Sequence, residues 1–374
     1  MSANAPSIQS SQRVFNFSAG PAVMPESVLD EIKDELLCYP GSGASIMEIS
    51  HRDKQFIEVL HDAEATIRDL LSISDDYSVM FMQGGATLQF SAVAANLLRG
   101  TGKTAQYLLT GSWGKKAIKE ARKEGPVETL YDASETNYDH VPDTGSIRCP
   151  GDAAYLYYCS NETIQGVQFA DEPECPASVP LVSDASSDFL CRPLDVSRYG
   201  LIYACAQKNA GPAGVTVVIL RKDLIDIADP SIPGYLHYKN HHDNDSEWNT
   251  PPTFAIYALG KVARWLRDEQ GGLESVHQLN IEKSKRLYDV IDRSEGFYRG
   301  HAQPSCRSLM NVTFNLPSDD LTKTFIAEAT EHSLAALKGH RSVGGIRASI
   351  YNAMPTAGVE SLAQFMTDFK NANQ

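Results

Sequence analysis

Two residues with reactive side chains stand at the ends of apolar runs in the sequence. Lys208 follows the run 201–206 and opens a turn rich in Gly and Pro, and Asp184 ends the run that starts at 179. A lysine is rarely buried without a partner or a chemical role. Desolvation makes a lysine lose its proton more readily, and a neutral amine can attack a carbonyl carbon to form a Schiff base. Considered alone, Lys208 is better interpreted as a solvated lysine in a loop, and Asp184 as a residue that favours a turn.

Taken together, the two residues favour a different interpretation. A Schiff-base amine and a carboxylate for a pyridinium nitrogen, both at strand ends, are what a pyridoxal 5'-phosphate (PLP) site requires. Gly84 and Gly85 lie between a predicted strand, 77–82, and a predicted helix from about 88 to 98. A helix that starts after such a turn offers free backbone N–H groups to an anion, although a plain turn would look the same. The Walker and G-x-G-x-x-G patterns are absent, which disfavours nucleotide and dinucleotide sites.

Further candidate residues follow predicted strands or stand beside glycines. Trp113, between Gly111 and Gly114, could stack on a flat cofactor ring, and Thr163 offers a hydroxyl. Arginine holds carboxylate or phosphate through two parallel hydrogen bonds, so basic residues beside glycines suggest a substrate with two anionic groups. Ordinary salt bridges are the alternative for each of them. These basic residues are His51, Arg52, His340, Arg341 and Arg347.

Bulk properties narrow the class of protein. The chain has 374 residues, which predicts two domains, and a net charge of -14, which argues against nonspecific nucleic-acid binding and an anionic membrane surface. The seven cysteines lack a C-x-x-C pair and predict reduced thiols in a cytoplasmic protein, without a zinc site. We expect 241–245, with two His and two Asp, to be a solvated loop and not a metal site. Residues 1–12 are expected to be a disordered tail, and no apolar run is long enough for a transmembrane helix.

Apolar patterns alternate between strands and helices over the first two thirds of the chain. This alternation predicts an α/β domain with a mainly parallel sheet, whose ligands gather at the carboxyl ends of the strands. Its strands are predicted at 77–82, 106–110, 154–159, 179–183, 201–206 and 215–220. We place this large domain at 13–264, with its N-terminal segment contacting the other domain, and a smaller α+β domain at 265–374. The helices of the second part are predicted at 253–268, 273–291, 321–331 and 359–370, with strands at 309–316 and 346–350.

Several stretches together resemble the phosphoserine aminotransferases, a class-V family of fold-type I PLP-dependent aminotransferases. The resemblance spans nearly the whole chain beyond the tail and implies a large domain with a seven-stranded type of sheet. In some members Gly-Arg or Gly-Cys stands in place of Ala86 and Thr87. The stretches are NFSAGPA at 16–22, MEISHR at 47–52, QGG at 83–85, NETI at 161–164, DVSRYG at 195–200, AQKN at 206–209, NTPPTF at 249–254, KGHR at 338–341 and RASIYNA at 347–353.

The resemblance also implies a role for each candidate residue. Lys208 is the Schiff-base lysine, Asp184 the partner of the pyridine nitrogen, Trp113 the stacking residue and Thr163 a hydrogen-bonding partner of PLP. The cofactor phosphate is held by Ala86, Thr87 and Gln207, with Asn249 and Thr250 of a neighbouring subunit, so the resemblance implies a homodimer. The anionic groups of the substrate are held by Arg52, Arg347, His51, His340 and Arg341.

The activity implied by the resemblance is reversible amino transfer from L-glutamate to 3-phosphohydroxypyruvate in serine biosynthesis. Members of the family in bacteria also act on the 4-phosphohydroxythreonine analogue in pyridoxine biosynthesis. Three alternatives remain at this point. The chain could be an alanine–glyoxylate aminotransferase, a cysteine desulfurase that uses Cys306, or a PLP-fold scaffold without catalysis.

Overall fold

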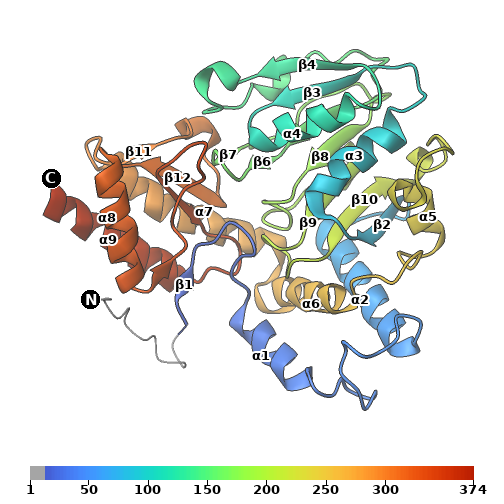
Figure 1. Ribbon diagram of the computed structural model, residues 1–374, viewed down its shortest axis with the longest axis horizontal. Helices are drawn as coiled ribbons and strands as arrows, with labels where there is room; N and C mark the ends of the chain where they lie inside the picture. The colour runs from blue at the N-terminus through green and yellow to red at the C-terminus, as the bar shows by residue number, and fades with distance from the viewer. Residues whose placement is uncertain (1–12) are drawn as a thin grey trace, which may run out of the picture.

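A seven-stranded sheet forms the centre of the larger part of the molecule. The computed structural model describes residues 13–374, and the predicted tail at 1–12 lies outside the described residues. The strand order is β2-β10-β9-β8-β5-β3-β4 (Figure 1). β10 is antiparallel to both of its neighbours, and the other strands pair in parallel. The strands are β2 (Tyr77–Met82), β3 (Ala105–Leu109), β4 (Val127–Asp132), β5 (Leu156–Cys159), β8 (Leu181–Asp184), β9 (Leu201–Cys205) and β10 (Thr216–Arg221).

Helices cover both faces of this sheet. Alternate residues of each inner strand enter two separate apolar cores, so that in β9 Ile202 and Ala204 face one core and Leu201 and Tyr203 the other. Such burial on both faces explains why these strands are continuous apolar runs. The first core is completed by α2 (Lys54–Leu71) and α6 (Thr253–Arg264), and the second by α3 (Gly85–Leu97), α4 (Ser112–Ala121) and the short α5 (Tyr238–Asp243).

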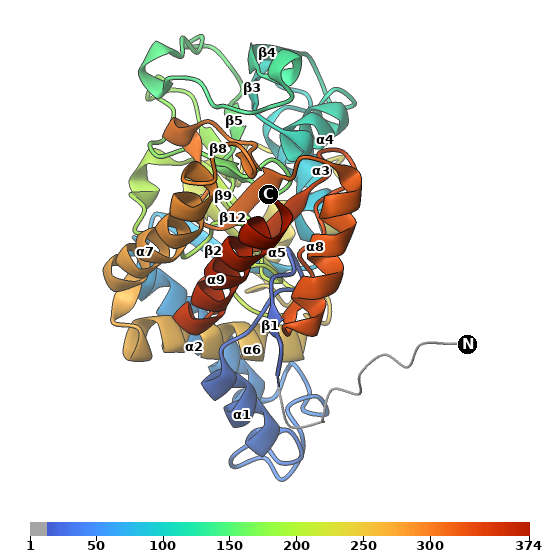
Figure 2. The ribbon, with the colours of Figure 1, turned by 90° about the vertical axis from the view of Figure 1, so that its left-hand side faces the viewer.

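A third core belongs to the C-terminal part of the chain. Its three-stranded sheet has the order β11-β12-β14 and packs against the last helices of the chain. The N-terminal segment joins this part, because β1 (Phe15–Asn16) pairs in parallel with β13 (Leu334–Ala335). The remaining elements are α1 (Glu26–Glu35), β6 (Asn161–Glu162), β7 (Val167–Gln168), α7 (Gly272–Asp292), β11 (Arg299–Gly300), β12 (Asn311–Asn315), α8 (Asp319–Glu331), β14 (Ile346–Ser349) and α9 (Thr356–Asn373). Figure 2 shows the helices of the C-terminal part, α7, α8 and α9, in front of the large sheet.

The structure differs from the sequence-based expectations in a few places. The segment 241–245 is not a solvated loop, because it belongs largely to α5 and His241 is buried with its Nε2 2.7 Å from the carbonyl oxygen of Tyr235. The packing of α5 against the edge strand β2 explains that burial. Several elements were not expected, among them α1, α4 and β4. The helix predicted at 253–268 ends as α6 at Arg264 and continues as a π-helical turn, Trp265–Glu269.

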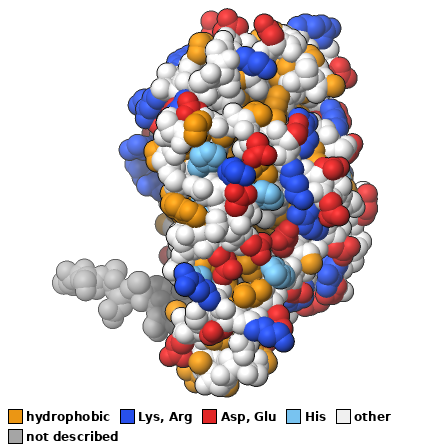
Figure 3. All heavy atoms as spheres, turned by 90° about the vertical axis from the view of Figure 1, so that its right-hand side faces the viewer, with side chains coloured by type: hydrophobic (Ala, Val, Ile, Leu, Met, Phe, Trp, Pro, Cys, Tyr) orange, Lys and Arg blue, Asp and Glu red, His pale blue; other side chains and the backbone are white. Residues whose placement is uncertain are grey.

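The surface is mixed in charge. Figure 3 shows acidic and basic side chains interspersed over one face of the molecule. Among residues 13–374, no helix is long and apolar enough to cross a membrane.

Candidate active site

The lysine at the end of β9 lies among the other residues predicted to surround it. The Nζ atom of Lys208 donates a hydrogen bond of 2.7 Å to Oγ1 of Thr163 and lies 5.2 Å from the centre of the Trp113 ring. The N-terminal segment also packs against it, because a Cβ on Gly20 would lie 3.3 Å from Cγ of Lys208. A hydrogen bond joins this segment to the residue before Lys208, because the carbonyl oxygen of Gln207 accepts the N–H of Ala22 at 2.9 Å.

The charge environment of Lys208 differs from the expectation drawn from burial alone. Burial lowers the pKa of Lys208, but interactions with Cys205, Tyr351 and the carboxylate of Asp184 raise it, so this pKa lies above its usual value. The amine is therefore protonated at neutral pH in this structure. Its deprotonation requires that some of the surrounding negative charge be neutralised.

Asp184 is a buried carboxylate at the end of β8. Its side chain accepts the N–H of Ser186 at 3.0 Å, and burial raises its pKa despite Lys208 and the Ser186 hydrogen bonds. No ion pair within residues 13–374 involves Asp184. A buried acid without a direct ion-pair partner is suited to hold a cationic ring nitrogen.

The start of α3 is open to an anion. Its N-cap is Gly84, whose φ of 88° is in the left-handed region that favours glycine. Within the described part of the chain, no hydrogen bond occupies the N–H groups of Gly85, Ala86 and Thr87. Within one chain, Asn249 contacts the residue before this turn, because its Nδ2 donates to Oε1 of Gln83 at 3.1 Å. The first turn of α3 can thus bind a phosphate.

Trp113 lies in the first turn of α4, where its orientation is fixed by other residues. Its backbone N–H donates to Oε2 of Glu162 at 3.0 Å. The indole Nε1 is buried without a hydrogen-bonding partner among residues 13–374. The ammonium of Lys116 lies over the ring at 4.0 Å from its centre. The indole ring thus lies next to Lys208 as an aromatic plate that already attracts cationic side chains.

Cationic side chains gather at one side of the site. Arg347 in β14 is partly buried, its pKa is lowered by burial, and no ion pair within residues 13–374 involves it. Burial and the charges of Arg347, Arg341 and Lys116 also lower the pKa of His340. The segments that carry His340 and Arg347 are adjacent, because the N–H of Gly339 donates to the carbonyl oxygen of Gly345 at 2.9 Å. An uncompensated, partly buried guanidinium is suited to a carboxylate or phosphate.

His51 and Arg52 lie elsewhere in the same chain. Both act electrostatically on Glu247, whose pKa is raised by burial and lowered by His51, His61 and Arg52. Glu247 lies in the loop that also carries Asn249 and the exposed Thr250. The structure therefore brings the segments of His340, Arg341 and Arg347 together, whereas His51 and Arg52 are linked to the 247–250 loop only by their effect on the pKa of Glu247.

Some residues of the site carried no assigned role in the sequence. Glu162 and Gln165 contact the start of α4, and Tyr351 donates to the carbonyl oxygen of Ala19 at 2.8 Å beside Lys208. Glu162 belongs to the NETI stretch at 161–164, and this stretch was the one sequence feature that could have indicated a role for it. Lys116 follows Trp113 by one helical turn and could have been found only by predicting α4.

Cys306 is not a mobile reactive thiol. Its side chain is buried, its Sγ lies 3.5 Å from the carbonyl oxygens of Asp139 and Gln303, and burial raises its pKa. These contacts disfavour the desulfurase alternative, which requires an accessible thiolate.

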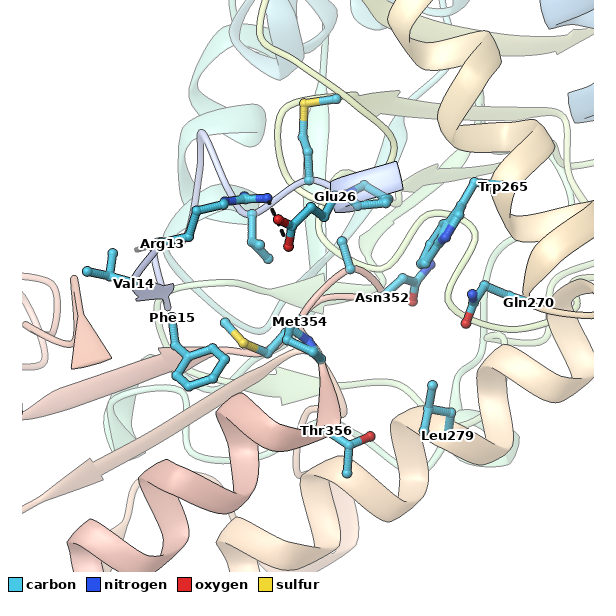
Figure 4. A pocket seen from close by; sticks show the side chains of 15 residues that line it. Arg13, Val14, Phe15, Glu26, Trp265, Gln270, Leu279, Asn352, Met354 and Thr356 are labelled. Atoms are coloured by element: carbon cyan, nitrogen blue, oxygen red, sulfur yellow. Dashed lines mark ion pairs between the residues drawn. The ribbon is translucent and has the colours of Figure 1, made fainter. Parts of the chain in front are cut away.

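A cavity of about 440 Å³ lies away from Lys208, between the N-terminal segment and the start of α9 (Figure 4). Phe15, Met354 and Leu279 give it an apolar lining, and Arg13 and Glu26 pair at its rim at 3.7 Å. None of the candidate site residues lines it. We assign it no part in the chemistry.

Comparison with known proteins agrees with this geometry. The family model for class-V aminotransferases matches residues 14–362. The phosphoserine aminotransferase of Rhodopirellula baltica is 77% identical over 97% of this chain and 96% of its own length. The structure of phosphoserine aminotransferase from Bacillus circulans subsp. alkalophilus superimposes with a TM-score of 0.94 at 46% identity, over 97% of this chain and 100% of that one. A PLP-bound phosphoserine aminotransferase from Trichomonas vaginalis gives a TM-score of 0.89 at 40% identity, over 95% and 100% of the two chains.

The chain belongs to the class-V aminotransferases. The predicted fold class, a fold-type I α/β architecture with a mainly parallel sheet, is confirmed by these structures. Within the class, the full-length relatives described above are phosphoserine aminotransferases.

Proposed function

We propose that the protein transfers the amino group of L-glutamate to 3-phosphohydroxypyruvate, giving 2-oxoglutarate and O-phospho-L-serine in a reversible step of serine biosynthesis. The observation that carries the proposal is the near-complete match to phosphoserine aminotransferases. Alanine–glyoxylate aminotransferase and a non-catalytic scaffold are not favoured, because the relatives that match nearly the whole chain at high identity are phosphoserine aminotransferases.

The residues present fit PLP as the cofactor. An open helix start at Ala86 and Thr87 suits its phosphate, Asp184 its ring nitrogen, and Trp113 its ring face. Thr163 and Gln207 complete the set of residues that would hold it, together with Lys208 as its covalent anchor. When bound, PLP supplies an aldehyde carbon and a ring that accepts the electron pair left on the substrate α-carbon.

Lys208 is the residue that we propose to move protons. As a neutral amine it would remove the proton from the α-carbon of the amino donor, and as the resulting ammonium it would return a proton to the cofactor carbon in the same half of the exchange, so it acts first as base and then as acid. A cation held by Asp184 neutralises one of the charges that raise the pKa of Lys208. Burial then favours the neutral amine that the reaction requires.

Arg347, His340 and Arg341 would hold the anionic groups of the substrate from the same chain as Lys208. His51 and Arg52 would complete the pocket from a second subunit, as would Asn249 and Thr250 for the cofactor phosphate. In support of a homodimer, large apolar side chains in the same regions are exposed. They are Leu36 (37%), Leu37 (88%), Met47 (63%) and Trp248 (43%).

Two further expectations belong to this proposal. The location is cytoplasmic, which agrees with seven cysteines that are all free in the structure. Activity on 4-phosphohydroxythreonine would link the enzyme to pyridoxine biosynthesis as well. That substrate carries the same phosphate and amino acid groups, so it requires the same cations.

A coupled assay tests the proposed substrate directly. With 2-oxoglutarate as acceptor, kcat/KM for O-phospho-L-serine should exceed that for L-alanine by at least roughly 100-fold, because buried cations left without an anion destabilise the complex with alanine. Equal use of the two donors would contradict the proposal.

A further inference from the structure

Glu162 is a buried acid that the proposed reaction does not use. It lies in β6, directly before Thr163, and its side chain is 0% exposed. No Lys, Arg or His within the described residues forms an ion pair with it. A buried carboxylate without a countercharge is costly, so its contacts require an explanation.

Those contacts are with the first turn of α4. Oε2 of Glu162 accepts the N–H of Trp113 at 3.0 Å, and Oε1 accepts the N–H of Gly114 at 2.9 Å. The N-cap of this helix, Gly111, has no side chain that could accept either bond. A carboxylate at this position satisfies the free N–H groups and interacts favourably with the positive end of the helix.

The carboxylate occupies space that two glycines leave open. A Cβ on Gly111 would lie 2.3 Å from Cδ of Glu162, and a Cβ on Gly114 would lie 3.4 Å from Oε1. Gln165 adds a second contact, because its Nε2 donates to Oγ of Ser112 at 2.8 Å. The helix start around Trp113 is therefore fitted to Glu162 and not only adjacent to it.

We propose that Glu162 is a positioning residue, which holds the first turn of α4 so that the Trp113 ring lies where the PLP ring stacks. This inference rests on the proposed function. Because Thr163 binds the Nζ of Lys208 at 2.7 Å, two consecutive residues position the aromatic plate and the reactive amine. Such supporting contacts fix the geometry of the residues that touch a ligand.

The charge of Glu162 provides a readout specific to this role. Burial raises its pKa to about 7, although the N–H groups of Gly114 and Trp113 lower it. An ionised carboxylate can accept both N–H bonds, whereas a protonated one holds them less well. The titratable groups that face it are Asp184 in β8, Lys208 after β9, Cys159 and Tyr157 in β5, and Tyr138.

The test compares PLP binding to the apo-forms of the wild-type protein and of Glu162→Gln. At pH 8 the Kd for PLP should rise about ten-fold in the variant, and near pH 6 the ratio of the two Kd values should approach one. All other groups are common to both proteins and cancel in the ratio. A wild-type Kd in Glu162→Gln at pH 8, or a ratio that does not change with pH, overturns the inference.

Asp188→Asn is the matched control. Asp188 is also buried, its pKa is raised by burial to about 6, and its Oδ2 accepts Nε2 of Gln168 at 3.1 Å, without contact to α4. Its Kd for PLP should stay within about two-fold of wild type. A ten-fold rise in this control as well would mean that loss of any buried carboxylate weakens binding, and it would overturn the inference.

Gly111→Ala tests the same contact if Glu162→Gln fails to fold. The added methyl displaces the carboxylate while leaving its charge, and it should raise the Kd for PLP by a similar factor. An unchanged Kd in Gly111→Ala overturns the inference. Failure of the wild-type protein to bind PLP would instead contradict the proposed function, so the two failures can be told apart.

Discussion

Two helices start at the same edge of the central sheet, and their first turns differ in how they are satisfied. The first turn of α3, after Gly84, has N–H groups without partners in the described residues, whereas that of α4 is closed by Glu162 and Gln165. Both helices have the same dipole and a glycine N-cap. The difference shows that a helix start becomes an anion site only when the fold leaves its N–H groups free.

Because their first turns differ in this way, α3 and α4 can make different contacts with a ligand. The open start of α3 can receive the phosphate of a cofactor, because phosphate brings the negative charge that the helix end favours. The closed start of α4 already contains a carboxylate, so it repels a second anion and presents an aromatic ring instead. One edge of the sheet thus offers a charged contact and a stacking contact to a single ligand.

The largest effect on turnover should come from substitution of Lys208. Lys208→Ala should leave the fold intact and lower turnover by at least about 10³-fold, because it removes the group that moves the α-carbon proton. The coupled assay measures the loss, and circular dichroism checks the fold. Lys285→Ala, at an exposed lysine of α7 that pairs with Asp289, is the control. Normal turnover in Lys208→Ala would refute the assignment.

The closed start of α4 predicts a dependence of stability on pH. A pKa of about 7 against a usual value of 4.5 means that the fold favours protonated Glu162. Its stabilising contribution is therefore fully present below pH 4.5 and is lost as the pH rises through 7. Relative to Glu162→Gln, the free energy of unfolding of the apo-protein should fall by about 3 kcal/mol over this range. Urea titrations of both proteins between pH 5 and 8 measure it, and parallel curves would contradict it.

The open start of α3 can be converted into a closed one. In Thr87→Glu, the new carboxylate occupies the third helical position, from which it can reach back to the N–H groups of the first turn. The apo-protein should be equally stable or slightly more stable, while the Kd for PLP should rise about 100-fold through repulsion of the phosphate. Thr87→Gln has the same shape without the charge and should bind PLP nearly normally. Unweakened binding in Thr87→Glu would place the phosphate elsewhere.

The smallest effect should come from Arg52, which we propose to serve the Lys208 site of the neighbouring subunit. Arg52→Ala should raise the KM for glutamate about ten-fold with little change in fold. Mixing subunits of Arg52→Ala and Lys208→Ala should restore about a quarter of wild-type sites, because each mixed dimer contains one intact site. No recovery on mixing would mean that Arg52 does not serve a neighbouring subunit.

The sequence determined the frame of the molecule and the residues at its strand ends. The strand predicted at 77–82 is β2 with the same bounds, and the others agree within a few residues, because strands that are buried on both faces of the sheet are uninterrupted apolar runs. Lys208 and Asp184 follow from that pattern, since each ends such a run. The family resemblance extended the set to residues whose local pattern is ordinary, such as Thr163 and Arg347.

Only the tertiary structure decided what closes or opens each helix start. The helix α4 was not expected, because glycines stand at its N-cap, Gly111, and in its first turn, Gly114. Its first turn is stabilised by Glu162, which lies 49 residues from Trp113 in the sequence. The pKa of Lys208 was expected to fall through burial but is raised by side chains from other elements. Local propensity is encoded in neighbouring residues, whereas capping, burial and charge at this site depend on residues that are adjacent only in the folded chain.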